Sequence, residues 1–130
     1  MRSPFRRLAA LFPALFVLHA APAGAQRARP LQFVYVLRLA STYHAEAAWT
    51  DADRAAVSAH FQRLAKATEA GQVVLAGRSE EPLDRTFGLV VFEAESEDAA
   101  RRFMEADPAV VAGVMRATLH PYSIALLRKG

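Results

Sequence analysis

The chain contains no cysteine, and this absence excludes several classes of function at once. Without a thiol there is no disulfide bond, no thiolate nucleophile and no cysteine that could carry a lipid. The G-x-S-x-G pattern of a serine nucleophile is missing as well. His44, His60 and His120 show neither an H-x-H nor an H-E-x-x-H spacing, so the sequence gives little support to a metal site.

An excess of charge of one sign is also absent once the N-terminal region is set aside. The chain has 16 Lys and Arg residues against 13 Asp and Glu residues. Arg2, Arg6 and Arg7 belong to the first 25 residues, and from Gln26 onward basic and acidic residues are equal in number. A nearly neutral domain gives no reason to expect binding to nucleic acid or to an anionic membrane.

No apolar run is long enough to predict a spanning helix. A bilayer-spanning helix needs roughly 20 apolar residues, and the stretch Leu8–Ala20 is shorter and is interrupted by Pro13. This stretch follows the basic segment Met1–Arg7, and the small residues that end at Ala25 match a signal-peptide cleavage site.

We therefore predict a signal peptide over residues 1–25 that is cleaved after Ala25. The remaining part, residues 26–130, has the length of one domain. It is expected to be periplasmic or secreted, with no stable membrane insertion after the leader is removed. The alternative is an uncleaved N-terminal anchor.

Hydrophobic periodicity in residues 26–130 predicts strands and helices in the order βαββαβ. This order is the split βαβ, or ferredoxin-like, plan of an α+β protein. Thr50 or Asp51 can cap the first helix, Gly71 can end it, and Ser96 can cap the second helix. Strands are predicted at Leu31–Leu39, Val73–Ala76, Phe87–Phe92 and Ala117–Leu127, and a short further turn at Ala109–Met115.

The predicted strands are apolar on both faces. In the first strand Phe33 and Tyr35 point to one side, whereas Val34 and Val36 point to the other. Two helices cover only one face of a sheet, and strands of this kind need cover on both. A second copy of the same sheet is the simplest cover, so we predict a homodimer.

His60 is the first candidate for chemistry. It lies about 60° from Val57 on a helical wheel and so borders the face of the first helix that carries Phe61, Leu64 and Thr68. A histidine there can be a neutral, hydrogen-bonded core residue, or it can line a pocket as an acid or base. Asp107 has a structural interpretation too, because it can cap a short helix that begins at Pro108.

Several segments together resemble the YciI-like, or YCII-related, family. The resemblance runs from Phe33 to about Leu127, and its segments come in the expected order. It implies a ferredoxin-like protomer that forms a dimeric α/β barrel, and a dyad of His60 and Asp107 in a pocket. The matching segments are His60 followed by Leu64, EAGQVVLAG (Glu69–Gly77), DPAVVAG (Asp107–Gly113) and HPY (His120–Tyr122).

One position departs from the family pattern. The family usually has Gly-Pro after the second strand, whereas this chain has Gly77-Arg78. Arg78 can bind an anionic substrate group or can be solvated. We take Arg78, His120 and Tyr35 as the candidate substrate-binding residues beside the dyad.

The resulting hypothesis is a cofactor-independent enzyme for a small organic molecule. Asp107 would fix the tautomer of His60, and the other ring nitrogen would move a proton in isomerase, lyase or dehalogenase-like chemistry on a small cyclic substrate. The alternative is a non-catalytic periplasmic dimer that binds a small ligand or is purely structural, with His60 and Asp107 as a buried pair. A cofactor-free monooxygenase is a third possibility, but no residue specifies an oxygen-reactive substrate.

Overall fold

The structure, a computed structural model, describes residues 29–130, so the predicted leader over residues 1–25 lies outside the described residues. Within this part of the chain, no helix combines the length and apolar character needed to cross a bilayer. The strands are β1 (Leu31–Leu39), β2 (Val73–Arg78), β3 (Phe87–Ala94) and β4 (Met115–Pro121). The helices are η1 (Ser41–His44), η2 (Glu46–Ala48), α1 (Asp51–Glu69), α2 (Glu97–Glu105) and α3 (Pro108–Val111).

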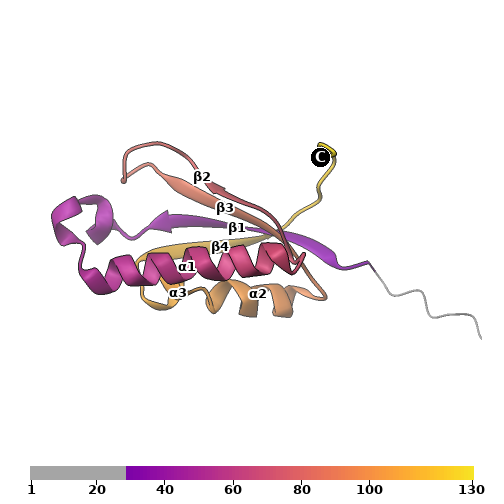
Figure 1. The fold of residues 1–130 in the computed structure, drawn as a ribbon, viewed down its shortest axis with the longest axis horizontal. Coiled ribbons are helices and arrows are strands. Elements are labelled where there is room, and N and C mark those ends of the chain that lie inside the picture. Colours follow the sequence, from indigo (N-terminus) through magenta and orange to yellow (C-terminus); the bar gives the residue numbers. More distant parts are fainter. Residues whose placement is uncertain (1–28) are drawn as a thin grey trace, which may run out of the picture.

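The four strands form one antiparallel sheet in the order β2-β3-β1-β4. All three α-helices lie on the same side of this sheet (Figure 1). The predicted ferredoxin-like α+β fold is therefore confirmed.

Local signals set the ends of both long helices. The Thr50 hydroxyl accepts a hydrogen bond from the Asp53 amide at 3.2 Å, and the Asp53 carboxylate accepts one from the Thr50 amide at 2.9 Å. This reciprocal pair is a capping box, which satisfies two amides at the start of α1. Gly71 follows the end of α1 with φ +79°, the left-handed conformation that glycine adopts most easily. The Ser96 hydroxyl caps α2 by accepting from the Ala99 amide at 3.1 Å.

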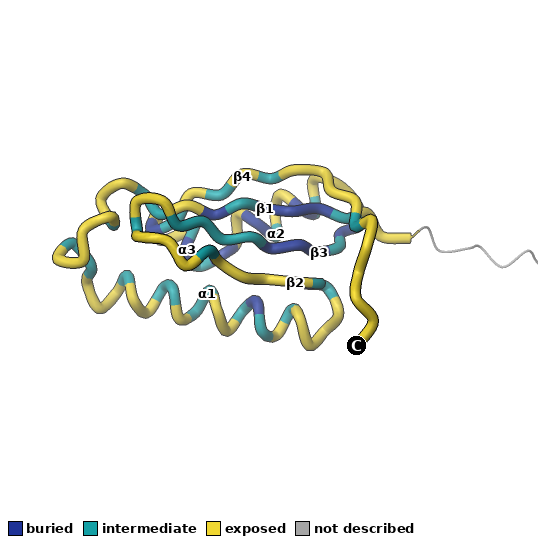
Figure 2. Tube along the Cα trace, turned by 90° about the horizontal axis from the view of Figure 1, so that it is seen from above, coloured by how far each residue is buried: buried dark blue, intermediate teal, exposed yellow. Residues whose placement is uncertain are grey.

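The core lies between β1, β3 and the helices that cover them. Tyr35 and Phe92 are fully buried there, with their rings in edge-to-face contact. Figure 2 shows the buried residues concentrated along β1 and β3, whereas most of α1 is exposed or intermediate. The buried side chains that α1 and α2 contribute to this core are Leu64, Ala100 and Met104.

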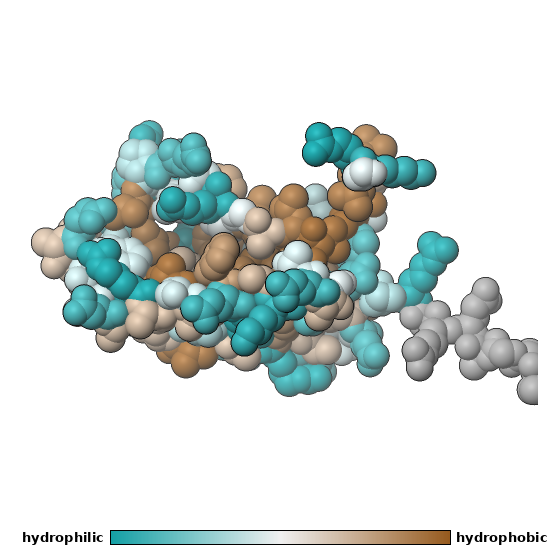
Figure 3. All heavy atoms as spheres, in the orientation of Figure 1, coloured by the Kyte–Doolittle hydropathy of each residue, from teal (hydrophilic) through white to brown (hydrophobic). Residues whose placement is uncertain are grey.

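Helix α1 is less buried than its periodicity predicts. Leu64 is its only buried residue, and Phe61, expected on the buried face, is 72% exposed, so that expectation was wrong. The physical reason is that this face of α1 borders a hollow rather than close-packed side chains. Figure 3 shows apolar surface gathered above α1, next to the strands.

The boundaries of three strands also differ from the prediction. β2 continues to Arg78 and β3 to Ala94, and β4 covers Met115–Pro121 rather than residues 117–127. β4 ends near the start of β1: Pro121 pairs with Phe33, and the Tyr122 amide donates to the Gln32 carbonyl at 3.0 Å. Residues 122–130 therefore leave the sheet as a C-terminal tail (Figure 1).

Candidate functional site

The fold brings His60 and Asp107 into direct contact. His60 projects from α1, and Asp107 lies between α2 and α3. The Nδ1 atom of His60 is 2.8 Å from Oδ1 and 2.7 Å from Oδ2 of Asp107. The Asp107 side chain is completely buried, and that of His60 is 14% exposed. Two groups 47 positions apart in the sequence thus form one partly accessible pair.

Asp107 is held by two further donors. The Tyr35 hydroxyl donates to Oδ2 at 2.9 Å, and the Ala109 amide donates to Oδ1 at 3.0 Å. The second bond is the predicted cap of the helix that begins at Pro108. Asp107 is therefore both a cap and the partner of His60.

The electrostatics of the pair favour an ionised Asp107. Burial alone raises the pKa of the carboxyl group, but hydrogen bonding and charge interaction with His60, together with the bonds from Tyr35 and Ala109, outweigh burial and bring the pKa below its ordinary value of 3.8. Burial, followed by the charge of Asp107 and the hydrogen bond to it, raises the pKa of the Tyr35 phenol above its ordinary value. Tyr35 therefore stays protonated and donates.

This arrangement assigns the tautomer of His60. An ionised carboxylate only accepts hydrogen bonds, so the Nδ1 atom beside it carries a hydrogen. In the neutral ring Nε2 then keeps its lone pair. Within residues 29–130 no hydrogen bond occupies Nε2, and the ring lines a cavity. His60 can accept or donate a proton at this nitrogen.

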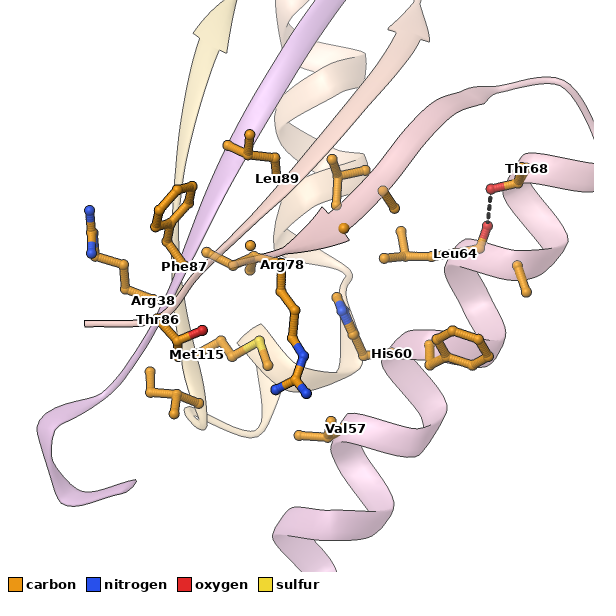
Figure 4. A pocket seen from close by; sticks show the side chains of 18 of the residues that line it. Arg38, Val57, His60, Leu64, Thr68, Arg78, Thr86, Phe87, Leu89 and Met115 are labelled. Carbon is orange, nitrogen blue, oxygen red and sulfur yellow. Dashed lines mark hydrogen bonds between the residues drawn. The ribbon is translucent and has the colours of Figure 1, made fainter. Parts of the chain in front are cut away.

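The cavity has a volume of about 870 Å³ and lies between α1 and the sheet. Figure 4 shows His60 on one wall, with the strands on the opposite wall. Most lining side chains are apolar; the charged or titratable ones are Arg38, His60, Glu69 and Arg78. The remaining lining residues are Leu37, Leu39, Trp49, Val57, Phe61, Leu64, Ala65, Thr68, Ala76, Gly77, Leu83, Thr86, Phe87, Gly88, Leu89, Val90 and Met115.

The candidate substrate-binding residues separate in space. Arg78 lines the cavity together with His60. Tyr35 does not line it but lies behind the dyad, where its hydroxyl contacts Asp107. His120 is exposed on β4, where it pairs with Val34 and so faces the side of the sheet opposite to Tyr35 and the helices. The positions of Tyr35 and His120 give no support to a ligand contact within this cavity.

Tyr35 and Arg63 make contacts that were not predicted from the sequence. Tyr35 supports Asp107, and the signal for this was available, because a buried tyrosine hydroxyl usually finds a polar partner. Arg63, one turn after His60, lies with its guanidinium 4.1 Å from the Phe103 ring centre and donates to the Phe103 carbonyl at 2.7 Å. Nothing in the sequence pattern indicated this contact. Among residues 29–130, no three His, Asp or Glu side chains are grouped as metal ligands.

Comparison with known families agrees with this geometry. The family model of the YCII-related domain matches residues 35–119, a range that includes His60, Arg78 and Asp107. A search among curated proteins finds no match to the chain. Because the family match covers well over half of the chain and the fold has the expected topology, the chain belongs to the YCII-related domain family.

Proposed function

We propose that this protein is a cofactor-independent enzyme in which His60 and Asp107 act as an acid–base dyad on a small organic substrate. One observation carries the proposal: Nδ1 of His60 bonds a completely buried carboxylate while the same ring lines a largely apolar cavity. Paired titratable groups at a cleft are a frequent mark of a functional site.

The chemistry follows from the tautomer. Nε2 takes a proton from an acidic C–H group of the substrate, and Asp107 stabilises the imidazolium that forms. Return of the proton at another carbon is an isomerisation, and departure of a leaving group with its electron pair is an elimination. General acid–base help of this kind contributes about 10²–10⁴-fold to a rate.

The proposal includes a homodimer. On the sheet face away from the helices, β1 and β3 present Val36 and Leu89, which are half-buried. No helix of the described chain covers this face (Figure 1). A second sheet packed against it would shield these apolar groups from water.

The second candidate is a non-catalytic protein that binds a small ligand. It is favoured by the structural role of Asp107, whose side chain caps α3 by accepting from the Ala109 amide. Asp107 is needed to start α3 whether or not any reaction occurs. In this alternative, His60 only satisfies the buried carboxylate, and the apolar cavity holds a ligand without changing it.

Proton exchange distinguishes the two candidates even when the product of the reaction is unidentified. Small cyclic ketones, lactones and halogenated acids are incubated with the protein in D₂O, and deuterium uptake at acidic C–H positions is followed by NMR. We expect uptake above the uncatalysed rate for at least one compound, and a loss of about 10²-fold or more in His60→Gln.

The matched control is His44→Gln, since His44 is exposed and does not line the cavity. This variant should retain the exchange rate. Equal rates in His60→Gln and the unaltered protein, with both variants folded by circular dichroism, would refute the acid–base role.

A further inference from the structure

Arg78, an exposed residue at the end of β2, places a positive charge beside a largely apolar cavity. The other cation of the lining, Arg38, lies over the Phe87 ring. In the sheet, Gly88 pairs with Arg78 on one side and with Leu37 on the other, so these three residues share the face covered by helices. The Leu37 side chain packs over Gly88, where a Cβ atom would meet it at 3.4 Å. Figure 4 shows the Arg78 side chain extending from β2 into the space between Met115 and His60.

No carboxylate neutralises this charge in the described part of the chain. The ion pairs of residues 29–130 join His60 to Asp107 and Glu97 to Arg101, and no hydrogen bond there involves the Arg78 side chain. Glu69, the carboxylate that lines the cavity, takes part in neither of these ion pairs. The guanidinium is therefore available to a ligand.

The rest of the cavity suits an apolar body. Val57, Phe61 and Leu64 come from α1, and Leu37, Val90 and Met115 come from the sheet. A ligand that fills this space and carries one anionic group would satisfy both the apolar walls and Arg78. A carboxylate matches the two parallel donors of a guanidinium better than a single point charge does.

We propose that Arg78 selects organic acids: a carboxylate binds the guanidinium, and an apolar body lies along α1 with its reactive carbon at His60. This inference rests on the proposed function, because the dyad defines where the substrate reacts. Arg78 acts as a specificity-determining residue, and it stands where the family usually has proline. A neutral substrate of the same shape would lack the interaction.

Matched ligands test the inference directly. 4-Phenylbutyrate and 4-phenylbutyramide differ in charge but hardly in size, and their binding can be followed by the fluorescence of Trp49, the single tryptophan, which lines the cavity. We expect the acid to bind about 10- to 100-fold more tightly than the amide. In Arg78→Gln this preference should fall to about twofold or less, with amide binding unchanged.

Arg102→Gln is the charge-matched control, because Arg102 is exposed on α2 and does not line the cavity. It should keep the full preference. An undiminished preference in Arg78→Gln would mean that Arg78 is only solvated, and equal binding of both ligands to the unaltered protein would also overturn the inference.

His60→Gln separates this inference from the proposed function. It should lose deuterium exchange but keep the preference for the acid. If His60→Gln loses the preference for the acid whereas Arg78→Gln keeps it, the carboxylate of the ligand binds His60 and the inference is overturned. If His60→Gln keeps normal exchange while Arg78→Gln loses the preference, the acid–base proposal fails and anion selection by Arg78 stands.

Discussion

At the scale of single residues, Asp107 combines a structural and a chemical position. Its two oxygens receive hydrogen bonds from His60, Tyr35 and the Ala109 amide. Because the carboxylate accepts these hydrogen bonds, it stays ionised although it is completely buried. The fold therefore gains stability from the same bonds that orient the imidazole.

This arrangement predicts that the contribution of Asp107 to stability depends on pH. The pKa of its carboxyl group is lowered in the folded state, so the unfolded chain takes up the proton first as the pH falls through the ordinary value of 3.8. The stabilisation is thus present above that value and is lost as the pH falls through the folded-state pKa. Asp107→Asn should cost about 2–3 kcal/mol at pH 7, and the difference from the unaltered protein should shrink below about pH 4.

Urea unfolding at several pH values measures this difference. Asp84→Asn, in the exposed turn after β2, removes the same charge and should cost little at any pH. A deficit of Asp107→Asn that stays constant from pH 7 to pH 3 would show that the charge of Asp107 contributes nothing.

At the scale of elements, α1 is determined locally at both ends but contributes little to the core. The capping box at Thr50 and the glycine at position 71 set its limits. Between them, Leu64 alone is buried, and the same face carries His60 and Phe61 along the cavity. The stability of this helix should therefore depend strongly on its ends.

Gly71→Ala tests the C-terminal end. A methyl group at this position meets no atom within 4 Å, so the cost comes from the left-handed backbone at φ +79°. We expect a loss of about 1 kcal/mol or slightly more in urea unfolding. Gly77→Ala is the matched control, since a methyl group there also meets no atom within 4 Å and its φ is not positive. Equal stability of the two variants would contradict a positive φ at Gly71.

At the scale of the whole molecule, no helix among residues 29–130 covers one face of the sheet, although Val34 and Val91 on that face are buried. Val36 pairs with Leu89 on that face, and the C-terminal tail leaves the molecule on the same side (Figure 1). Leu126 and Leu127 in the tail are 94% and 66% exposed. A second copy packed against this side of the sheet would bury apolar groups of this kind, in keeping with the proposed homodimer.

Light scattering should therefore report a dimer at micromolar concentration. Val36→Glu places a charge at the centre of the uncovered face and should shift the protein to a monomer with unchanged circular dichroism. Val111→Glu is the control, because Val111 is 72% exposed on α3, on the opposite side of the sheet. A monomeric unaltered protein would refute the dimer.

The sequence by itself determined the order of elements and most of their ends, because those depend on neighbours within a few positions. Thr50, Gly71, Ser96 and Asp107 occupy the caps and stop predicted for them. The pairing of His60 with Asp107 was implied by family resemblance, since neither residue alone distinguishes a site from a core position.

Only the tertiary structure decided what surrounds those elements. It placed Phe61 beside a hollow, His120 on the far face of the sheet and Tyr35 against Asp107. It also turned Arg78 toward the cavity. These outcomes depend on strand register and on how closely α1 approaches the sheet. Both are set by the packing of segments far apart in the chain, which local periodicity does not encode.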